Sequence, residues 1–315
     1  MDSDHPLGFV IWGVARSGTT ALERAANLVP GIFCLHEGQI GFQPQPPEPR
    51  FPRFVLGGDR GWIGAEELTR ARALLRAKLK AGGVALYGNK HPGYVSIVSQ
   101  LRAQFPDCRN LVIHRGTAGF LRSWDVKAAR QRRGWDVHQT GLIGLWEWIL
   151  ALDALASFPE RTLVVSFDAI FTGDLDCFGD LVGRLLGSPA DQATRARFEA
   201  ELFRQGPDDS GAEADEIYRP ILASVGAPDL DRAVRGWRLA DAADHAAYLR
   251  AFVDAAAPKV ARFVTGALAA SGCAEKQRFA ATWLGLRQHR YGKSTRPSAA
   301  VLEGFGLLLR QAATA

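Results

Sequence analysis

A glycine loop with hydroxyl groups and one cation follows the first apolar stretch of the chain. Residues 13–20 read GVARSGTT, so Gly13 and Gly18 keep the spacing of a phosphate-binding loop, GxxxxGK[ST]. Thr19 stands where that loop has its lysine, and the cation has moved forward to Arg16. The candidate binding residues of the loop are Arg16, Ser17, Gly18, Thr19 and Thr20. Backbone N–H groups at the start of a following helix would hold a phosphate here.

The composition of this loop predicts a particular kind of ligand. Without the lysine that accompanies triphosphate and Mg²⁺, a guanidinium among hydroxyls suits an anion that is transferred from a nucleotide with no bound metal. The alternative is a small-residue turn between a strand and a helix that binds nothing, because such a loop by itself is a motif of low specificity.

The wider segment 9–22, FVIWGVARSGTTAL, resembles the 5′-phosphosulfate loop of sulfotransferases that use 3′-phosphoadenosine 5′-phosphosulfate (PAPS). It is nearer to the RSGTT form of the tyrosylprotein and carbohydrate sulfotransferases than to the KSGTTW form of the cytosolic ones. The resemblance implies PAPS as the co-substrate, adenosine 3′,5′-bisphosphate as the product, and no metal ion.

The same family has an arginine at a strand end and a serine eight residues later, which together bind the 3′-phosphate. The segment LVIHRGTAGFLRSW supplies Arg115 and Ser123 at this spacing. An arginine can bind a phosphate bidentately, and a serine in the following helix can donate to the same group. Gly116 departs from the family pattern, which has Asp or Asn at this place. The alternative for Arg115 is a surface charge at a strand end.

The RSGTT subgroup also places a glutamate base about twenty residues past the loop arginine, and Glu37 of FCLHEG matches it. His36 is the competing base, since the cytosolic members use histidine. Neighbouring residues of a strand point to opposite faces, so we expect only one of the two to face the cleft, and we favour Glu37. Apolar Phe33 and Leu35 lead us to expect a raised pKa for Glu37.

Two further basic segments fit the resemblance. In YGNKHPGYV (87–95), Lys90 matches an NKxP motif that brings a lysine to the phosphosulfate bridge. In RYGKSTRP (290–297), Lys293 or Arg290 could supply a late basic loop over the 3′-phosphate. The alternatives are a solvated lysine in the first segment and a plain surface loop in the second.

These residues imply an in-line sulfuryl transfer in which Arg16 and Lys90 stabilise charge on the bridging oxygen and Glu37 takes the acceptor proton. The acceptor is expected to be a hydroxyl of a small molecule or of a sugar on one. The proline-rich segment 43–53 and the helical stretch 190–270 are candidates for an acceptor lid. The tryptophans considered for an acceptor pocket, most of them expected in the core instead, are Trp62, Trp124, Trp146, Trp148 and Trp237.

The elements that position these residues alternate between apolar strands and helices. Strands are predicted near 8–13, 31–36, 84–89, 110–114 and 162–167, and helices near 21–29, 66–81, 96–104, 118–132 and 142–157. This order predicts an α/β fold with a P-loop-type parallel sheet flanked by helices and a helical C-terminal extension. We expect one domain over 1–315, with a core over about 8–187, a helical acceptor or lid region over about 188–285, and a C-terminal basic loop and tail over 286–315.

Composition limits the remaining possibilities. The chain has 315 residues, 47% hydrophobic and 23% charged, which excludes extensive disorder. A net charge of +5 is too weak to indicate nucleic acid as a partner. Four scattered cysteines without metal-ligand spacing indicate free thiols, and no stretch is predicted to act as a secretory signal or a membrane span. We therefore expect a cytoplasmic protein. A homodimer stays open, because no feature of the sequence sets the oligomeric state.

Two rival functions stay open on sequence alone. A metal-dependent nucleotide kinase would need a lysine at position 19, where the chain has Thr19. A nucleotide-binding P-loop protein without sulfotransferase activity, kinase-like or regulatory, would keep the loop and lack catalysis. Glu37 and Lys90 argue against that loss.

Overall fold

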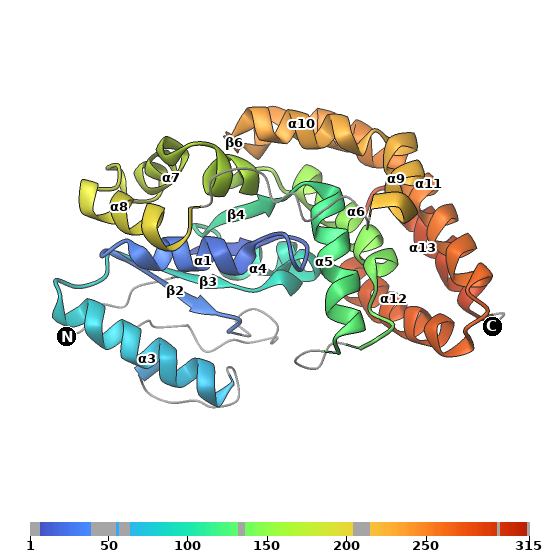
Figure 1. Ribbon diagram of the computed structural model, residues 1–315, viewed down its shortest axis with the longest axis horizontal. Coiled ribbons are helices and arrows are strands. Elements are labelled where there is room, and N and C mark those ends of the chain that lie inside the picture. The colour runs from blue at the N-terminus through green and yellow to red at the C-terminus, as the bar shows by residue number, and fades with distance from the viewer. Residues whose placement is uncertain are drawn as a thin grey trace.

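The computed structural model describes residues 7–38, 55–56, 64–131, 136–203, 215–294 and 297–313. Six strands form one sheet in the order β2-β3-β1-β4-β5-β6, as Figure 1 shows in part. The first five run parallel and β6 runs antiparallel to β5. The strands are β1 (Leu7–Trp12), β2 (Ile32–His36), β3 (Leu86–Lys90), β4 (Arg109–His114), β5 (Thr162–Ser166) and β6 (Leu239–Asp241). The predicted parallel sheet is confirmed.

Helices cover both faces of the sheet, and the alternation along β1 shows why. Phe9 and Ile11 contribute to the apolar cluster on one face, whereas Val10 and Trp12 contribute to the cluster on the other. All four side chains are buried, which accounts for the continuous apolar run of this strand.

One face carries α1 (Thr19–Leu28), α7 (Leu175–Leu186) and α8 (Gln192–Glu201). The other carries α3 (Ala65–Lys80), η1 (Pro92–Ile97), α4 (Val98–Gln104), α5 (Thr117–Ala129) and α6 (Gly141–Ser157). The remaining helices are η3 (Ala169–Gly173), α9 (Asp215–Val225), α10 (Ala227–Trp237), η4 (Ala242–His245), α11 (Ala246–Ala270), α12 (Ala274–Ser294) and α13 (Ala299–Ala313).

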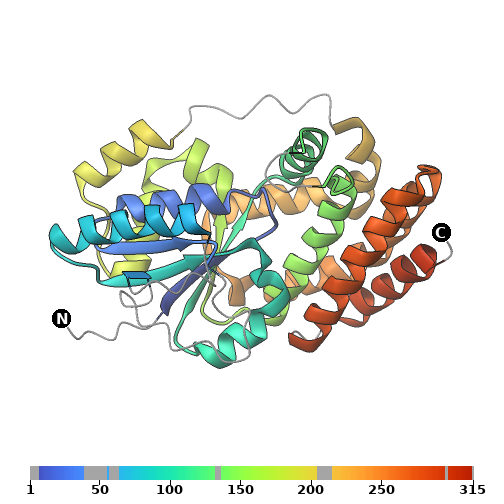
Figure 2. The same cartoon turned by 90° about the horizontal axis from the view of Figure 1, so that it is seen from below.

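The C-terminal helices extend the second face. Figures 1 and 2 show α11, α12 and α13 packed side by side at one end of the molecule. A buried carboxylate on α6 ties them to the core, because Asp153 accepts hydrogen bonds from Arg250 on α11 and from Tyr291 on α12 (2.8 Å). The predicted helical extension is therefore confirmed.

Two details of the sequence interpretation are wrong. Residues 286–294, expected to begin a basic loop, are the last turns of α12. The region after Asp174 also contains a strand, β6, which was not predicted because three residues carry no measurable alternation.

Three of the four cysteines, Cys34, Cys108 and Cys177, are buried, and all four are free thiols. In the described parts of the chain, no helix combines the length and the apolar character needed to cross a bilayer. The proline-rich segment 43–53, Trp62 and most of the polar segment 206–215 lie outside the described residues.

Candidate active site

The loop between β1 and α1 has a backbone that requires glycine at two places. Gly13 has φ +153° and Gly18 has φ +105°. A Cβ atom on Gly13 would lie 2.6 Å from the carbonyl oxygen of Ile113, and one on Gly18 would lie 2.3 Å from the ring of Phe167. The sequence spacing of these glycines therefore reflects close packing of the loop on β4 and on the residue that follows β5.

Arg16 joins this loop to α5. Its backbone adopts a left-handed conformation (φ +76°), and its Nε donates a 2.9 Å hydrogen bond to Oγ of Ser123, 107 positions later. Trp124, the next residue of α5, donates to the carbonyl oxygen of Ala15 at 2.6 Å. The loop and the predicted 3′-phosphate serine are thus brought together.

Arg115, the residue directly after β4, lies close enough to Arg16 for their charges to interact. Its guanidinium carbon lies 4.9 Å from the centre of the Phe167 ring. Burial lowers the pKa of Arg16, and the positive charge of Arg115 lowers it further. A guanidinium whose charged form is disfavoured by burial and by a neighbouring cation is typical of a site that takes an anion.

The loop also keeps donors for such an anion. Among the described residues, Oγ of Ser17 is buried and has no hydrogen-bond partner, and no side chain caps the N-terminus of α1. The first N–H groups of a helix have no acceptor within it, so those at the start of α1 face outward from the helix. The N–H of Ser17 already donates to the carbonyl of Val14 (3.0 Å), so the backbone donors left for an anion begin at Gly18.

Glu37 and Lys90 form an ion pair at the C-terminal ends of β2 and β3. Lys90 Nζ donates to Glu37 Oε1 at 2.8 Å, and the Glu37 N–H donates to the Lys90 carbonyl at 2.7 Å. The lysine side chain is fully buried, whereas the glutamate side chain is 48% exposed. Glu37 has a left-handed backbone (φ +50°), an unusual conformation for a residue other than glycine that often accompanies a functional site.

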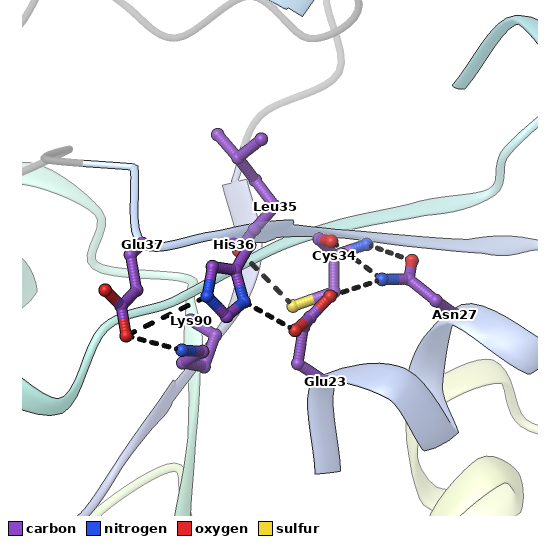
Figure 3. A network of polar contacts seen from close by, with 7 residues as sticks. All are labelled: Glu23, Asn27, Cys34, Leu35, His36, Glu37 and Lys90. Atoms are coloured by element: carbon purple, nitrogen blue, oxygen red, sulfur yellow. Dashed lines mark hydrogen bonds and ion pairs between the residues drawn. The ribbon is translucent and has the colours of Figure 1, made fainter. Parts of the chain in front are cut away.

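His36 lies between two carboxylates, as Figure 3 shows. Its Nδ1 is 2.8 Å from Glu23 Oε2 on α1, and its Nε2 is 3.9 Å from Glu37 Oε1. Asn27 donates to the second oxygen of Glu23 at 3.0 Å and also bonds the backbone of Cys34. Glu23 is buried, so this network holds the imidazole ring in place beside the ion pair.

The expected rise in the pKa of Glu37 is wrong. Burial acts to raise this pKa, but the charge and hydrogen bond of Lys90, helped by His36 and His91, lower it below its ordinary value. The sequence interpretation considered the apolar neighbours Phe33 and Leu35, whereas the groups that decide the pKa come from the next strand of the sheet.

His91 follows Lys90 and was not predicted. Its Nδ1 accepts a 2.9 Å hydrogen bond from the N–H of Gly93, which caps η1. Burial lowers the pKa of His91 to about 4; Glu37 opposes this shift, whereas the charges of Lys90, Arg287 and His36 add to it. The ring is therefore neutral near pH 7.

Some of these groups border a cavity of about 460 Å³, whereas Lys90 and Ser123 are not among its lining residues and Ser17 and Arg115 line a separate pocket. The near wall of the cavity holds Arg16, Thr19, Thr20, Glu37 and His91. His36 is not among the lining residues, so only one of the two candidate bases reaches the cavity, as expected. The strand alternation used to predict this does not explain it, because Glu37 lies past the end of β2.

The far wall comes from α5, α6 and α12, including Lys127, Glu147, Trp283, Arg287 and Arg290. Glu147 Oε1 accepts hydrogen bonds from Arg287 Nε (2.6 Å) and from Trp283 Nε1 (2.9 Å), and Arg287 Nη1 donates to Ser96 at 2.8 Å. The guanidinium carbon of Arg287 also lies 4.9 Å from the centre of the Trp283 ring. This wall is therefore a fixed structure rather than a set of solvated side chains.

The remaining predicted residues separate into two groups. Arg290 borders the cavity, whereas Lys293 is exposed and is not among the lining residues. Trp124 lines the cavity, while Trp146 and Trp148 are buried in the core against Phe305 and Phe252. Trp237 stacks on His245 with ring centres 3.9 Å apart.

Several site residues gave little signal in the sequence. Arg287 belongs to the basic stretch noted at 287–297, and His91 belongs to the NKxP motif, so both lay within recognised segments. Glu23 and Glu147 had no recognisable motif. Both are carboxylates within helices that bury them, at 8% and 5% exposure, and a buried carboxylate needs a partner that only the folded chain reveals.

No protein-family model matches the chain, and no curated protein sequence matches it. Among solved structures, the chain is similar to sulfotransferase STF9 from Mycobacterium avium, with 13% identity and a TM-score of 0.40 over 70% of this chain and 77% of that one. It is also similar to the sulfotransferase domain of the olefin synthase from Synechococcus PCC 7002, with 13% identity and a TM-score of 0.42 over 74% of this chain and 96% of that one.

Proposed function

We propose that this chain is a sulfotransferase that moves the sulfuryl group of PAPS to a hydroxyl of a small-molecule or glycosylated acceptor. One observation carries the proposal. Segments that are far apart in the sequence meet at one cavity: Arg16, which bonds Ser123, and Glu37, which bonds Lys90, both line it.

The described residues suit the sulfonated nucleotide. Within the part of the chain that the structure describes, Oγ of Ser17 is a buried polar atom without a partner, and α1 begins with no capping side chain. The backbone at Gly18–Thr20, with the hydroxyls of Thr19 and Thr20, would hold the 5′-phosphate at the positive end of the helix dipole. Arg115 and Ser123 would hold the 3′-phosphate. Lys293 was expected to help, and its exposed position gives that role no support.

Arg16 and Lys90 would stabilise the negative charge that grows on the bridging oxygen as the sulfuryl group leaves. PAPS supplies an activated sulfuryl group, and the contribution of the protein is then position and charge. Arg16 is partly buried and Lys90 fully buried, so their charges act in a medium less polar than water.

Glu37 would take the proton of the acceptor hydroxyl. In the absence of ligand its carboxylate is ionised, because Lys90 lowers its pKa. When Lys90 turns toward the bridging oxygen, Glu37 loses that partner while its burial continues to raise the pKa. The base therefore strengthens at the moment when a proton has to be removed. His36 is the alternative base, held by Glu23 with Nε2 3.9 Å from Glu37.

The cavity supports a small acceptor. Its volume of about 460 Å³ lies within the roughly 300–1,000 Å³ of small-molecule sites. Trp283 and Leu286 offer apolar surface on the far wall, and Arg290 offers a cation. We also place the enzyme in the reducing environment of the cytoplasm, in keeping with its four free thiols.

Calorimetry with PAPS, adenosine 3′,5′-bisphosphate and ATP–Mg²⁺ tests the nucleotide. We expect heat release with PAPS and the bisphosphate and none with ATP–Mg²⁺. A preference for ATP–Mg²⁺ would indicate a kinase-like protein and overturn the proposal.

A screen of hydroxylated and glycosylated acceptors with ³⁵S-labelled PAPS tests the transfer. Labelled product that forms with the native chain and is lost in Glu37→Gln is the expected result. Tight binding of PAPS without labelled product from any acceptor would favour the alternative, a nucleotide-binding P-loop protein that does not catalyse transfer.

A further inference from the structure

Asp231 on α10 bonds both sides of the connection that carries Arg115. Its Oδ1 accepts from His114 Nε2 and from Thr117 Oγ1, each at 2.8 Å, and its Oδ2 accepts from the Thr117 N–H at 2.8 Å. His114 is the last residue of β4 and Thr117 the first of α5. Arg115 and Gly116 are the only residues between them.

The N-terminus of α5 has no cap from its own chain segment. Its N-cap residue, Gly116, has no side chain, and a helix start normally needs an acceptor for its free N–H groups. Asp231 provides this acceptor from 114 positions later in the sequence. Its side chain is 20% exposed and that of His114 is 10% exposed, so the contact is largely shielded from solvent.

We propose that Asp231 is a positioning residue for the nucleotide site, which holds the short β4–α5 connection so that Arg115 and Ser123 point at one phosphate. This inference rests on the proposed function. It assigns a nucleotide-side role to α10, which belongs to the helical region expected to serve the acceptor. Asp231 itself does not touch the nucleotide.

A second contact holds α10 at the same place. Arg235, one turn after Asp231, forms a 3.3 Å ion pair with Asp168, which follows β5. Asp168 and Asp231 both approach Gly116, where a Cβ atom would lie 3.8 and 3.9 Å from their carboxylate oxygens. Those distances are ordinary contacts, so a small side chain at position 116 fits.

The test measures binding of adenosine 3′,5′-bisphosphate by calorimetry. For Asp231→Ala we expect the affinity to fall on the order of tenfold, the size of a lost charged hydrogen bond or helix cap. Turnover at saturating PAPS should change little, because the transfer residues stay in place. Asp229→Ala is the matched control on the same helix, since Asp229 pairs only with exposed Arg232 among the described residues.

The double variant Gly116→Asn, Asp231→Ala distinguishes positioning from a general loss of stability. Asparagine is a favourable N-cap and restores an acceptor at the start of α5 from within the segment itself. We expect it to recover much of the bisphosphate affinity. Equal affinity in the native chain and Asp231→Ala would overturn the inference alone. Failure of the native chain to bind the bisphosphate would contradict the proposed function, and the inference with it.

Discussion

At the β2–β3 edge of the site a lysine and a glutamate hold each other at 2.8 Å, whereas at the β1–β4 edge two arginines, Arg16 and Arg115, are neighbours. The first pair is compensated within the protein. The two arginines bring like charges close together, and burial of Arg16 further disfavours its charged form. The C-terminal end of the sheet therefore carries an ion pair of opposite charges on one side and two neighbouring like charges on the other.

This difference indicates separate roles for the Glu37–Lys90 pair and the two arginines. A pre-formed ion pair is ready for proton and charge transfer and needs no ligand for its stability. Neighbouring guanidinium groups gain most when an anion lies between them, so they should serve affinity. Changes at Glu37 should therefore alter turnover, changes at Arg115 should alter nucleotide binding, and changes at Arg16 should alter both.

Replacement of the base should have the largest effect. We expect Glu37→Gln to lower kcat by roughly 10²–10⁴-fold, because a positioned general base contributes about that much. The glutamine keeps an oxygen for Lys90, so bisphosphate affinity should stay close to that of the native chain. His36→Asn should reduce kcat less, since His36 does not border the cavity. A larger loss in the histidine variant would make His36 the base.

Removal of the phosphate arginine should produce the converse result. Arg115→Ala should weaken PAPS binding by about 1.5–3 kcal/mol, the value of a hydrogen bond to a charged group, and leave kcat at saturation nearly unchanged. Arg109→Ala removes the same charge from the other end of β4 and serves as the control. Calorimetry of both variants checks this. Equal loss of nucleotide affinity in Arg115→Ala and Glu37→Gln would remove the contrast between the two sides.

The neutral histidine beside the ion pair predicts a pH dependence of stability. The pKa of His91 falls to about 4 on folding, so between its ordinary value near 6.5 and that value only the unfolded chain takes up the proton. Stability is full above about pH 6.5 and falls as the pH drops toward 4.

The variant His91→Asn keeps an acceptor for the Gly93 N–H and does not titrate. Urea unfolding at about pH 7.5 and about pH 5 should show that the native chain loses up to about 2 kcal/mol more than the variant. The same loss in both proteins would mean that His91 is protonated in the folded state.

The smallest expected effect separates stability from binding. Arg16→Ala should change the unfolding free energy of the ligand-free chain by no more than about 0.5 kcal/mol, because it removes one of two like charges together with a single hydrogen bond to Ser123. The native chain should gain about 2.7 kcal/mol from bisphosphate at about 100 times its Kd, and the variant much less at that concentration. Thermal melts with and without bisphosphate measure both. A strongly destabilised ligand-free variant would show that Arg16 is structural.

Much of the fold could be predicted from local patterns. Four of the first five strands centre on a short apolar run, β3 (LYGNK) being more polar, and the helices between the strands are long enough for right-handed crossovers, so the parallel sheet follows. The prediction failed where the pattern was weak. β6 has three residues, and the basic stretch 286–294 continues a helix because its other face packs through Tyr291.

For the candidate site too, the residues in local motifs could be predicted, whereas the contacts between distant segments could not. Arg16, Lys90, Arg115 and Ser123 belong to motifs; the sheet places the first three at or just past the end of a strand, and Ser123 lies within α5. The pKa of Glu37 could not be predicted, because Lys90 reaches it from a neighbouring strand 53 positions away. Glu23 and Asp231 were missed for the same reason. Each is an ordinary carboxylate until the fold brings a histidine beside it.

The sequence alone determined which residue types stand after which strands, because apolar runs and glycine spacing are local properties of the chain. The tertiary structure alone decided which charges meet. It paired Lys90 with Glu37, placed the like charges of Arg16 and Arg115 close together, and brought Asp231 to the start of α5. Electrostatic interactions depend on distance and burial across the packed chain, and neither quantity is written in the order of the residues.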